Sequence, residues 1–417
     1  MENITDGREL IDSAYYAAHG PPHEIWARLR AESPVHRCEP AATEPFWAIT
    51  KHEDICEIST RPDLFLNRPG VAVLPERQED AMRDSKFGSM RSIINMDPPE
   101  HRAYRKVAAR EFTPRAVRDL DELIETSARE IVDELAGETG EGTCDFATDV
   151  AARHPLRVLS HMLGVPREQE ADILRITNQL FAFDDPELRR SDDFATAMRD
   201  LAMEAFEMFD AVIEDRRACP RHDLATVLAT GTVDGEPMGV RETLGYYLIV
   251  FSAGHDTTKN ALVGGMHAFV EHPEELVKLR ADPALVDKAV EEVTRWTSPV
   301  NYMKRTAAVD TEIRGQRIAA GDALALFYGS ANRDEDAFED PSEFRIDRQS
   351  TSRNLGFGIG EHFCLGANLA RRSQRALWLE LGRRLDWAEL AGEPERTEAS
   401  FVIGMKHLPI RYRLRAA

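Results

Sequence analysis

The sequence predicts a mainly α-helical protein with a small β-rich region built from both ends of the chain. Helical periodicity is the stronger signal, because apolar residues recur at three- and four-residue spacing over long stretches. Strand-like segments are fewer and shorter. The stretches with helical periodicity are 24–32, 116–137, 195–218 and 287–297.

The strand signals lie in two parts of the sequence. "PFWAIT" (45–50) comes early, "TEIRGQRIAAGDALALFYG" (311–329) reads as hairpin material, and "HLPIRYRL" (407–414) closes the chain. No Gly/Ser-rich or proline-rich linker interrupts the sequence. We therefore expect residues 1–417 to form one mainly α domain with a small sheet region.

Composition excludes several classes of protein. The chain has 417 residues, 42% of them hydrophobic, and a net charge of −21. This charge argues against nucleic-acid binding, which depends on neutralising phosphates, and against adhesion to anionic membranes. The polar, acidic N-terminus lacks the profile of a signal peptide. The longest apolar run, 244–254, is shorter than the roughly 20 residues of a membrane span. We expect a cytoplasmic protein.

One of the five cysteines stands apart from the others. The absence of a CxxC pair argues against a disulfide framework or a zinc knuckle, and four cysteines read as small buried apolar residues. Cys364, however, lies in "GFGIGEHFCLGANLAR" (356–371), directly before a predicted helix. A helix N-terminus favours the thiolate, which is the form that binds metals. Gly358, Gly360 and Gly366 would let a flat ligand approach this loop.

This loop resembles the haem-binding loop of the cytochromes P450. The matching positions are Phe357, Gly360, His362, Cys364, Gly366, Leu369, Ala370 and Arg371. The resemblance implies the mainly α P450 fold and a haem b cofactor whose iron is bound by Cys364. It also places Phe357, Gly358 and Gly366 against the porphyrin. A thiolate on haem iron favours cleavage of the O–O bond.

A second motif, "LGYYLIVFSAGHDTTKNAL" (244–262), combines an apolar helix face with a polar interruption. One apolar stripe at helical spacing is formed by Leu244, Tyr247, Leu248 and Phe251. The polar residues 254–258 that follow are costly to bury unless they are paired or functional. Alone, they are typical of a helix cap or of hydroxyls bonded to the preceding turn.

The same motif resembles the long central helix of the P450 fold, with its acid–alcohol pair. The resemblance implies that Asp256 relays protons from solvent and that Thr257 holds the water that delivers them. Small residues at Ala253 and Gly254 would leave room for oxygen. A dry pocket that uses protons needs such donors.

A third motif is the pair Glu292 and Arg295, which lie one turn apart on a predicted helix. In P450s a pair at this place belongs to the structural core behind the haem. Many relatives complete the network with an arginine where this chain has Glu343. The third partner is therefore left unassigned, with Arg345 and Arg348 as candidates. The same spacing recurs in pairs that we expect to be solvated: Glu187/Arg190, Glu214/Arg217, Glu380/Arg383 and Glu393/Arg396.

The two propionates of a haem need basic partners. The resemblance assigns this role to His101 and Arg105, one helical turn apart, and to Arg305 and His362. Read alone, the segment with His101 and Arg105 would be an ordinary basic surface helix. Where many bacterial relatives have a histidine ten residues before the cysteine, this chain has Asn354, which weakens one expected contact.

A local reversal of charge suggests a protein partner. Residues 101–118 carry one acid, Glu111, and six basic residues: Arg102, Arg105, Lys106, Arg110, Arg115 and Arg118. If the fold is that of a P450, Arg371 and Arg372 lie on the same proximal face. A basic surface above the cofactor of an acidic protein suits an acidic ferredoxin, itself reduced by a ferredoxin reductase.

Together, the resemblance implies a monooxygenase that inserts one atom of O2 into a hydrophobic small molecule. The stretches 301–316 and 401–413 are similar to those of bacterial P450s that oxidise steroids, terpenoids and branched lipids. Family position suggests a set of pocket residues, each of which could equally be ordinary core. These residues are Phe87, Phe181, Phe183, Tyr246, Val250, Val300, Tyr302, Phe401 and Val402.

Three other functions are compatible with parts of the pattern. A peroxide-driven peroxygenase of the same fold would not need the Asp256–Thr257 pair. A non-catalytic haem carrier or gas sensor would have no use for that pair or for the basic face. A haem-free protein with Cys364 as nucleophile would need His362 as its base, but residues two apart on a glycine-rich loop rarely form such a pair.

Overall fold

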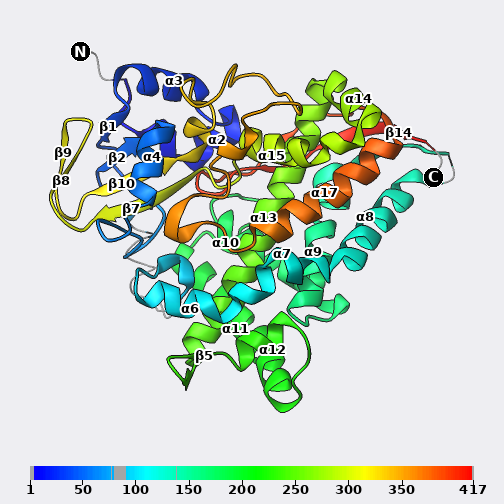
Figure 1. The fold of residues 1–417 in the computed structure, drawn as a ribbon, viewed down its shortest axis with the longest axis horizontal. Coiled ribbons are helices and arrows are strands. Elements are labelled where there is room, and N and C mark those ends of the chain that lie inside the picture. The colour runs from blue at the N-terminus through cyan, green and yellow to red at the C-terminus, as the bar shows by residue number, and fades with distance from the viewer. Residues whose placement is uncertain (1–3, 77, 79–90, 138, 416–417) are drawn as a thin grey trace.

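A computed structural model describes residues 4–76, 78, 91–137 and 139–415 of the chain. It shows a large helical body with a smaller sheet region on one side (Figure 1). The predicted mainly α fold is confirmed, and so is the origin of the sheet in both parts of the sequence.

The main sheet has five strands in the order β1-β2-β10-β7-β3. β10 pairs with β2 in parallel, and the other neighbours are antiparallel. The central strands β2 and β10 are buried at every position, which is why their sequences read as continuous apolar runs. The strands are β1 (Val35–Cys38), β2 (Phe46–Ile49), β10 (Ala323–Phe327), β7 (Tyr302–Ala307) and β3 (Phe65–Leu66).

The remaining strands form small sheets around the helical body. One has three strands in the order β11-β14-β4, and the others are two-stranded. The predicted hairpin material at 311–329 therefore divides, since its first part forms β8 and β9 and its last part joins the main sheet as β10. The bounds are β4 (Glu141–Asp145), β5 (Thr232–Val233), β6 (Glu236–Pro237), β8 (Thr311–Ile313), β9 (Gln316–Ile318), β11 (Leu385–Leu390), β12 (Glu395–Arg396), β13 (Met405–His407) and β14 (Pro409–Leu414).

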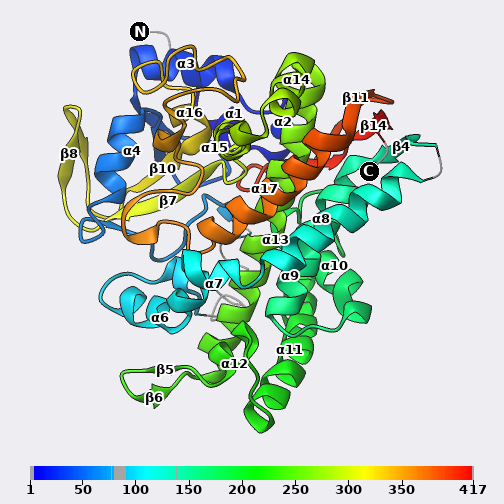
Figure 2. The same ribbon diagram turned by 45° about the vertical axis from the view of Figure 1, so that its right-hand side comes forward.

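Helix α13 (Val240–Glu271) runs through the middle of the molecule (Figures 1 and 2). Its 32 residues make it about 48 Å long. Most of its side chains are buried, because helices α9, α10, α11, α12, α15 and α17 all pack against it. It is longer at both ends than the predicted segment 244–262.

Helix α17 (Ala367–Arg384) begins directly after the cysteine loop, and it packs on α8, α13 and α15 (Figure 2). The cysteine is thus anchored to the core of the helical body. The other helices are α1 (Arg8–Ile11), α2 (Ser13–His19), α3 (His23–Glu32), α4 (His52–Ser59), α6 (Glu100–Ala108), α7 (Pro114–Arg118), α8 (Asp121–Ala136), α9 (Arg153–Met162), α10 (Glu170–Phe181), α11 (Phe194–Ala218), α12 (Leu224–Ala229), α14 (Pro273–Ala281), α15 (Val286–Thr297) and α16 (Tyr328–Ala331).

The structure differs from the prediction at 116–137, which it divides into α7 and α8. The backbone N–H groups of Asp119 and Leu120 bond to carbonyls three residues back instead of four, which ends α7. Apolar periodicity continues across the break, so the pattern alone could not reveal it. Within the described ranges, no helix combines the length and apolarity needed to cross a bilayer.

Candidate active site at the cysteine loop

The cysteine loop and helix α13 enclose a cavity of about 230 Å³, here called the cofactor cavity. Thr257 reaches it from α13, whereas Asp256 is not among its lining residues. The structure brings all ten residues predicted to contact the cofactor to this one cavity. They are His101, Arg105, Ala253, Gly254, Arg305, Phe357, Gly358, His362, Cys364 and Gly366.

Backbone contacts hold the loop in place. The Cys364 N–H donates to the Phe357 carbonyl at 2.9 Å, and the guanidinium of Arg371 lies 4.4 Å from the centre of the Phe357 ring. Gly358 has φ +66°, a conformation that suits glycine. A side chain at Gly360 would meet the Ser59 carbonyl at 2.3 Å. Gly360 therefore serves the packing of the loop on α4 and not the approach of a ligand.

Opposing influences act on the thiol of Cys364, a residue that is half-buried. Burial raises its pKa, while the N–H groups of Gly366 and Ala367 and the charges of Arg105 and Arg371 lower it. The net direction is upward, so the predicted effect of the helix start is present but smaller than that of burial. A bound metal cation deprotonates a coordinating thiol outright, so an iron bound at Cys364 would hold the sulfur as the thiolate.

A basic cradle lies beside the cysteine. Arg305 is 4% exposed and forms no ion pair with any described carboxylate, and burial lowers its pKa. The Nε2 atom of His362 is buried without a hydrogen-bond partner. The pKa of His362 is lowered to about 3, first by burial and then by the neighbouring His101 and Arg305. A buried guanidinium without a carboxylate and an imidazole nitrogen without a hydrogen-bond partner fit an anionic group.

These observations test whether a haem suits the cavity. The cavity offers a sulfur ligand, apolar walls, a buried guanidinium without a carboxylate, and an unpaired imidazole nitrogen. The sulfur ligand and the apolar walls suit a porphyrin and its iron. The guanidinium and the imidazole nitrogen suit its propionates. The residues therefore fit the group. Asn354 is not among the lining residues and instead donates to Glu291 at 2.8 Å.

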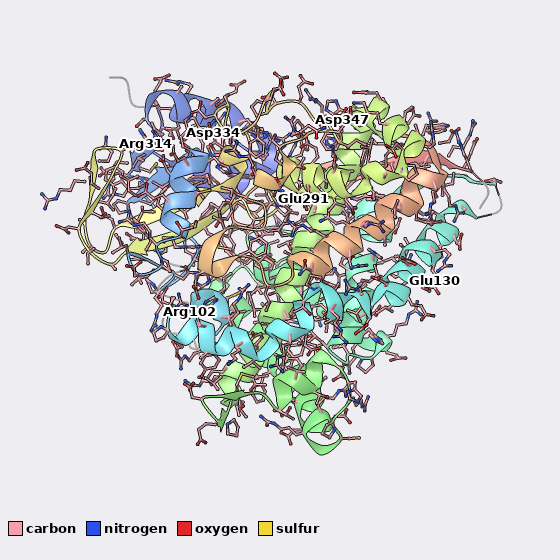
Figure 3. The ribbon with its side chains drawn as sticks, viewed as in Figure 1. Arg102, Glu130, Glu291, Arg314, Asp334 and Asp347 are labelled. Atoms are coloured by element: carbon pink, nitrogen blue, oxygen red, sulfur yellow. The ribbon has the colours of Figure 1, made fainter. Side chains whose placement is uncertain are left out.

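His101 and Arg105 reach the loop from helix α6. The rings of His101 and His362 are 4.0 Å apart, and His101 Nδ1 lies 3.2 Å from Glu361, which also accepts from Arg102. Burial lowers the pKa of His101 although Glu361 opposes this shift. Arg105 donates to the Phe363 carbonyl at 2.6 Å. In Figure 3 the loop passes between the labelled Arg102 on α6 and Glu291 on α15.

The acid–alcohol pair lies on the middle of α13. Thr257 donates to the Ala253 carbonyl at 2.6 Å, so its lone pairs are its free hydrogen-bonding positions in the cavity. Asp256 is buried and ion-paired with Lys259, one turn further on. A side chain at Gly254 would meet Leu159 at 3.1 Å. The space next to Gly254 is thus partly filled by α9 and not simply left for oxygen.

The Glu292 network behind the loop is fully buried. Arg295 donates two hydrogen bonds to Glu292, each of 2.7 Å. The side chain of Arg348 donates to Glu292 at 3.1 Å, whereas Arg345 contributes only its backbone N–H at 2.9 Å. Arg348 is the third side-chain partner. Glu343 takes part through its carbonyl, which accepts from both arginines.

A second, larger cavity of about 1110 Å³, here called the outer cavity, adjoins the first. Ile94 and Ile249 line both cavities and mark the boundary between them. Four of the predicted pocket residues line the outer cavity, namely Phe181, Phe183, Tyr302 and Phe401, and two line the cofactor cavity, namely Val250 and Val300.

Two of the other predicted pocket residues, Tyr246 and Val402, line neither cavity. Tyr246 is a buried core residue whose hydroxyl donates to the Tyr104 carbonyl at 3.2 Å, and it lines neither cavity. Val402 is also absent from both linings, although its β-bridge partner Val300 lines the cofactor cavity. Phe87 lies outside the described residues. Tyr246 and Val402 were predicted from family position, which does not say which face of an element points inward.

Sequence reasoning missed Tyr328, Lys259 and Ser252. Tyr328 lines the cofactor cavity near Arg305, and burial raises its pKa while Arg305 lowers it. Lys259 follows Asp256 by three residues, a spacing that could have predicted the ion pair. Ser252 lines the outer cavity, and a polar residue in an otherwise apolar stretch of α13 was its signal.

Comparison with known proteins agrees with this geometry. The family model described as Cytochrome P450 matches residues 71–414. A protein named cytochrome P450-terp, from a Pseudomonas species, is 37% identical, and the alignment covers 97% of this chain and 96% of that protein. A steroid C26-monooxygenase of Rhodococcus jostii is 36% identical, with 99% and 86% covered.

Solved structures give the same result. A crystal structure of a cytochrome P450 from Novosphingobium aromaticivorans superposes with a TM-score of 0.89 at 37% identity, and the match covers 98% of each chain. The agreement extends over almost the full length, and it includes the cysteine loop and the central helix on which the cofactor cavity depends. The chain belongs to the cytochrome P450 family of haem-thiolate monooxygenases.

Proposed function

We propose that this monooxygenase inserts one oxygen atom of O2 into a hydrophobic small molecule, using electrons from an acidic ferredoxin. The observation that carries the proposal is the meeting of the Cys364 loop and the Thr257 turn of α13 at one cavity. The haem, when bound through Cys364, supplies the activation of dioxygen, for which thiolate ligation is suited. Arg305, His362 and His101 would hold its propionates.

The residues of α13 would manage protons in this site. The lone pairs of Thr257 face the cavity, because its hydroxyl proton is bonded to the Ala253 carbonyl. Thr257 can therefore accept from a water molecule and hold it in place. Asp256 stands next to it, outside the cavity lining and ion-paired with Lys259, and would carry protons between solvent and the Thr257 turn. A peroxide-driven enzyme would not need this pair.

The electron donor would dock on the face that carries helices α6 and α7. Several basic residues of this face already have acidic partners, namely Arg102, Arg371 and Arg372. Others are exposed and form no ion pair with a described residue, namely Lys106, Arg110, Arg115 and Arg118. Unpaired cations attract an acidic partner without first giving up an ion pair. Phe363, 39% exposed, adds an apolar contact next to the cysteine.

A hydrophobic substrate is supported by the walls of the outer cavity. They carry five aromatic rings, from Phe181, Phe183, Phe194, Tyr302 and Phe401, and burial of apolar area is the main source of binding energy in such pockets. The relative from R. jostii is named for a steroid substrate. We therefore place the substrate among steroids, terpenoids and similar lipids.

Two measurements test the function. The reduced, carbon-monoxide-bound protein should show the long-wavelength Soret band of a thiolate-ligated haem, and Cys364→Ala should abolish it. Turnover should require NAD(P)H, ferredoxin and reductase. Equal turnover with peroxide alone would favour a peroxygenase, and an absent thiolate band would contradict the whole proposal.

The docking face has its own test. Reversing charge at Arg110 and Arg115 should slow reduction by an acidic ferredoxin at low salt by about tenfold or more and should leave the carbon monoxide spectrum unchanged. Arg317→Glu is the control, because its side chain is 83% exposed on the distant strand β9. An unchanged reduction rate in the double variant would contradict docking at this face.

A further inference from the structure

Unpaired polar atoms gather around the outer cavity. Buried polar atoms in proteins are nearly always hydrogen-bonded, so each exception needs a reason. Among the described residues, five buried side-chain atoms that lack a partner belong to residues lining this cavity. They are Thr43 Oγ1, Gln78 Oε1, Ser92 Oγ, Asn95 Oδ1 and Ser252 Oγ.

Ser252 is the most informative of the five. Its side chain is fully buried on α13, and the neighbouring lining residues Leu248 and Ile249 are apolar. It lies five residues before Thr257, which is about 7.5 Å along the helix axis. Five residues also turn the helix by about 140°, which is why Ser252 lines the outer cavity and Thr257 lines the cofactor cavity.

Asn95 offers a second unpaired atom in the lining of the same cavity. It ends the short helix η1 (Ile93–Asn95), which packs on α13. Its Oδ1 can only accept a hydrogen bond, whereas the Ser252 hydroxyl can donate or accept. A ligand group that both donates and accepts can bond to either atom. An alcohol hydroxyl has this property, and a hydrocarbon has neither function.

The charges of the outer cavity disfavour a substrate with a carboxylate. Its described cationic lining residues, Arg8, Arg189 and Lys304, all form ion pairs with acidic side chains. Asp184 and Glu398 line the cavity as well, and burial raises the pKa of both carboxyls. An incoming anion would meet negative charge and no free cation among these residues.

We propose that Ser252, assisted by Asn95, selects hydrophobic substrates that carry a neutral hydroxyl group. The inference rests on the proposed monooxygenase function and names its substrate class more closely. In the absence of substrate, water would satisfy both atoms. A hydrocarbon that displaces this water leaves the atoms unpaired, whereas an alcohol replaces the hydrogen bonds it removes. The hydroxyl therefore gives selectivity as well as affinity.

The test compares matched ligands in matched proteins. Farnesol and cholesterol are titrated against the haem-loaded protein beside their deoxy hydrocarbons and methyl ethers, with dissociation constants read from the spin-state shift and repeated by calorimetry. Ser252→Ala removes only the hydroxyl, and loss of an unpaired buried hydroxyl should not harm folding. Ser59→Ala is the control, since Ser59 is equally unpaired and buried but lines neither cavity.

At least one alcohol should bind wild type about 3- to 10-fold tighter than its hydrocarbon. Ser252→Ala should remove most of this ratio by weakening the alcohol alone, and Ser59→Ala should retain it. The methyl ether, which cannot donate to Asn95, should fall between the two ligands. In Asn95→Ala, the alcohol and the methyl ether should then bind with similar dissociation constants.

Several outcomes would overturn the inference. The first is a preference for alcohol over hydrocarbon, measured as the ratio of their dissociation constants, that is the same in Ser252→Ala and wild type. The second is a wild-type ratio near one for both the farnesol and the cholesterol skeleton. The third is a loss of the preference in the control Ser59→Ala. The carbon monoxide spectrum of each preparation separates the two proposals. If the thiolate band is present and Ser252→Ala leaves the alcohol-to-hydrocarbon preference unchanged, the proposal for Ser252 is contradicted and the monooxygenase proposal stands. If the band is absent, the monooxygenase proposal fails, and calorimetry still measures the ratio.

Discussion

Asp256 and Lys259 form a buried ion pair one helical turn apart on α13, and Lys259 also donates to Asn178 Oδ1 on α10 at 3.1 Å. The Asn260 amide lies 3.4 Å from the second Asp256 oxygen. The Asp256 carboxylate, next to the cofactor cavity, therefore pairs with a cation of its own helix. Lys259 in turn connects it to helix α10 through the hydrogen bond to Asn178. A proton that passes through Asp256 must do so within this arrangement.

Asp256→Asn should lower kcat by about 100-fold, because an amide keeps the shape of the carboxylate but cannot accept and return a proton. Substrate binding, read from the spin-state shift, should change little, since Asp256 lines neither cavity. The measurement is steady-state turnover with saturating ferredoxin.

The control for this prediction is Asp287→Asn on α15, whose side chain is 75% exposed. It should retain full turnover. If Asp256→Asn also retained wild-type kcat, the proton relay would have to run through another group. A parallel loss of haem would show instead that the residue acts on structure.

The Glu292 network should be important for stability. Arg348→Ala would leave a fully buried carboxylate with one partner fewer, and breaking such a buried pair costs about 3–5 kcal/mol. The expected result is a loss of this size in the free energy of unfolding, measured by urea denaturation of the haem-loaded protein. Arg345→Ala should cost much less, because Arg345 reaches Glu292 only through its backbone N–H.

Glu214 provides a matched control for burial. It forms the same i,i+3 pair with Arg217 as Glu292 does with Arg295, but the Glu214 side chain is 66% exposed. Glu214→Ala should change the free energy of unfolding by less than about 0.5 kcal/mol. If Glu214→Ala lowered the free energy of unfolding as much as Arg348→Ala does, this would contradict the argument that burial, and not spacing, decides how much an ion pair stabilises the fold.

The sequence could predict the parts of the site that are local in the chain. The cysteine loop, the polar turn of α13 and the Glu292–Arg295 pair each lie within about twenty consecutive residues, so their spacing carries their meaning. The continuous apolar strands β2 and β10 were likewise recognisable because burial on both faces leaves a continuous pattern.

The remaining features depend on contacts between distant segments, which no local pattern contains. Nothing in the sequence distinguishes Arg348 from Arg345 as the partner of Glu292. The space beside Gly254 is decided by Leu159 on another helix. Ser252 became a candidate only when its hydroxyl was found unpaired at a cavity wall. Such features require the packing of elements and not their order.

Arg305 should help to bind the cofactor, and its buried charge should lower the stability of the protein without haem. It is buried without a carboxylate partner, so Arg305→Met should leave the apo-protein as stable as wild type or more so. The loss of a charge-assisted bond to a propionate should speed haem release by about 10- to 100-fold. The measurement is the rate of haem transfer to apomyoglobin.

Arg333→Met is the comparison for Arg305. Arg333 is also buried, and burial lowers its pKa to about 9, but it stacks on Trp296 and does not line the cofactor cavity. Its replacement should leave haem release unchanged. Equal acceleration in both variants would indicate a general loosening of the fold instead of a propionate contact.

His154 should make stability depend on pH in the acid range. Burial lowers the pKa of His154 to about 4, and the neutral ring accepts from Ser127 and donates from Nε2 to the Ser373 carbonyl at 3.0 Å. Between the unfolded value of 6.5 and about 4, the unfolded chain binds a proton that the folded chain does not. The stabilisation is thus complete above pH 6.5 and is lost as the pH falls, by about 1.4 kcal/mol per pH unit.

His154→Gln removes this titration, so its stability relative to wild type should improve steadily as the pH is lowered from 6.5 toward 4 in urea denaturation. His407 gives the opposite sign, because Asp145 and Glu187 raise its pKa. The stabilisation from His407 is complete below pH 6.5 and is lost as the pH rises through the folded value. Relative to wild type, His407→Gln should therefore lose stability as the pH falls from the folded value toward 6.5 and stay level below it, whereas His154→Gln should change only below 6.5. A change in His407→Gln confined to the range below pH 6.5, or one in His154→Gln confined to the range above it, would contradict that assignment, because a general acid effect cancels when each variant is compared with wild type at the same pH.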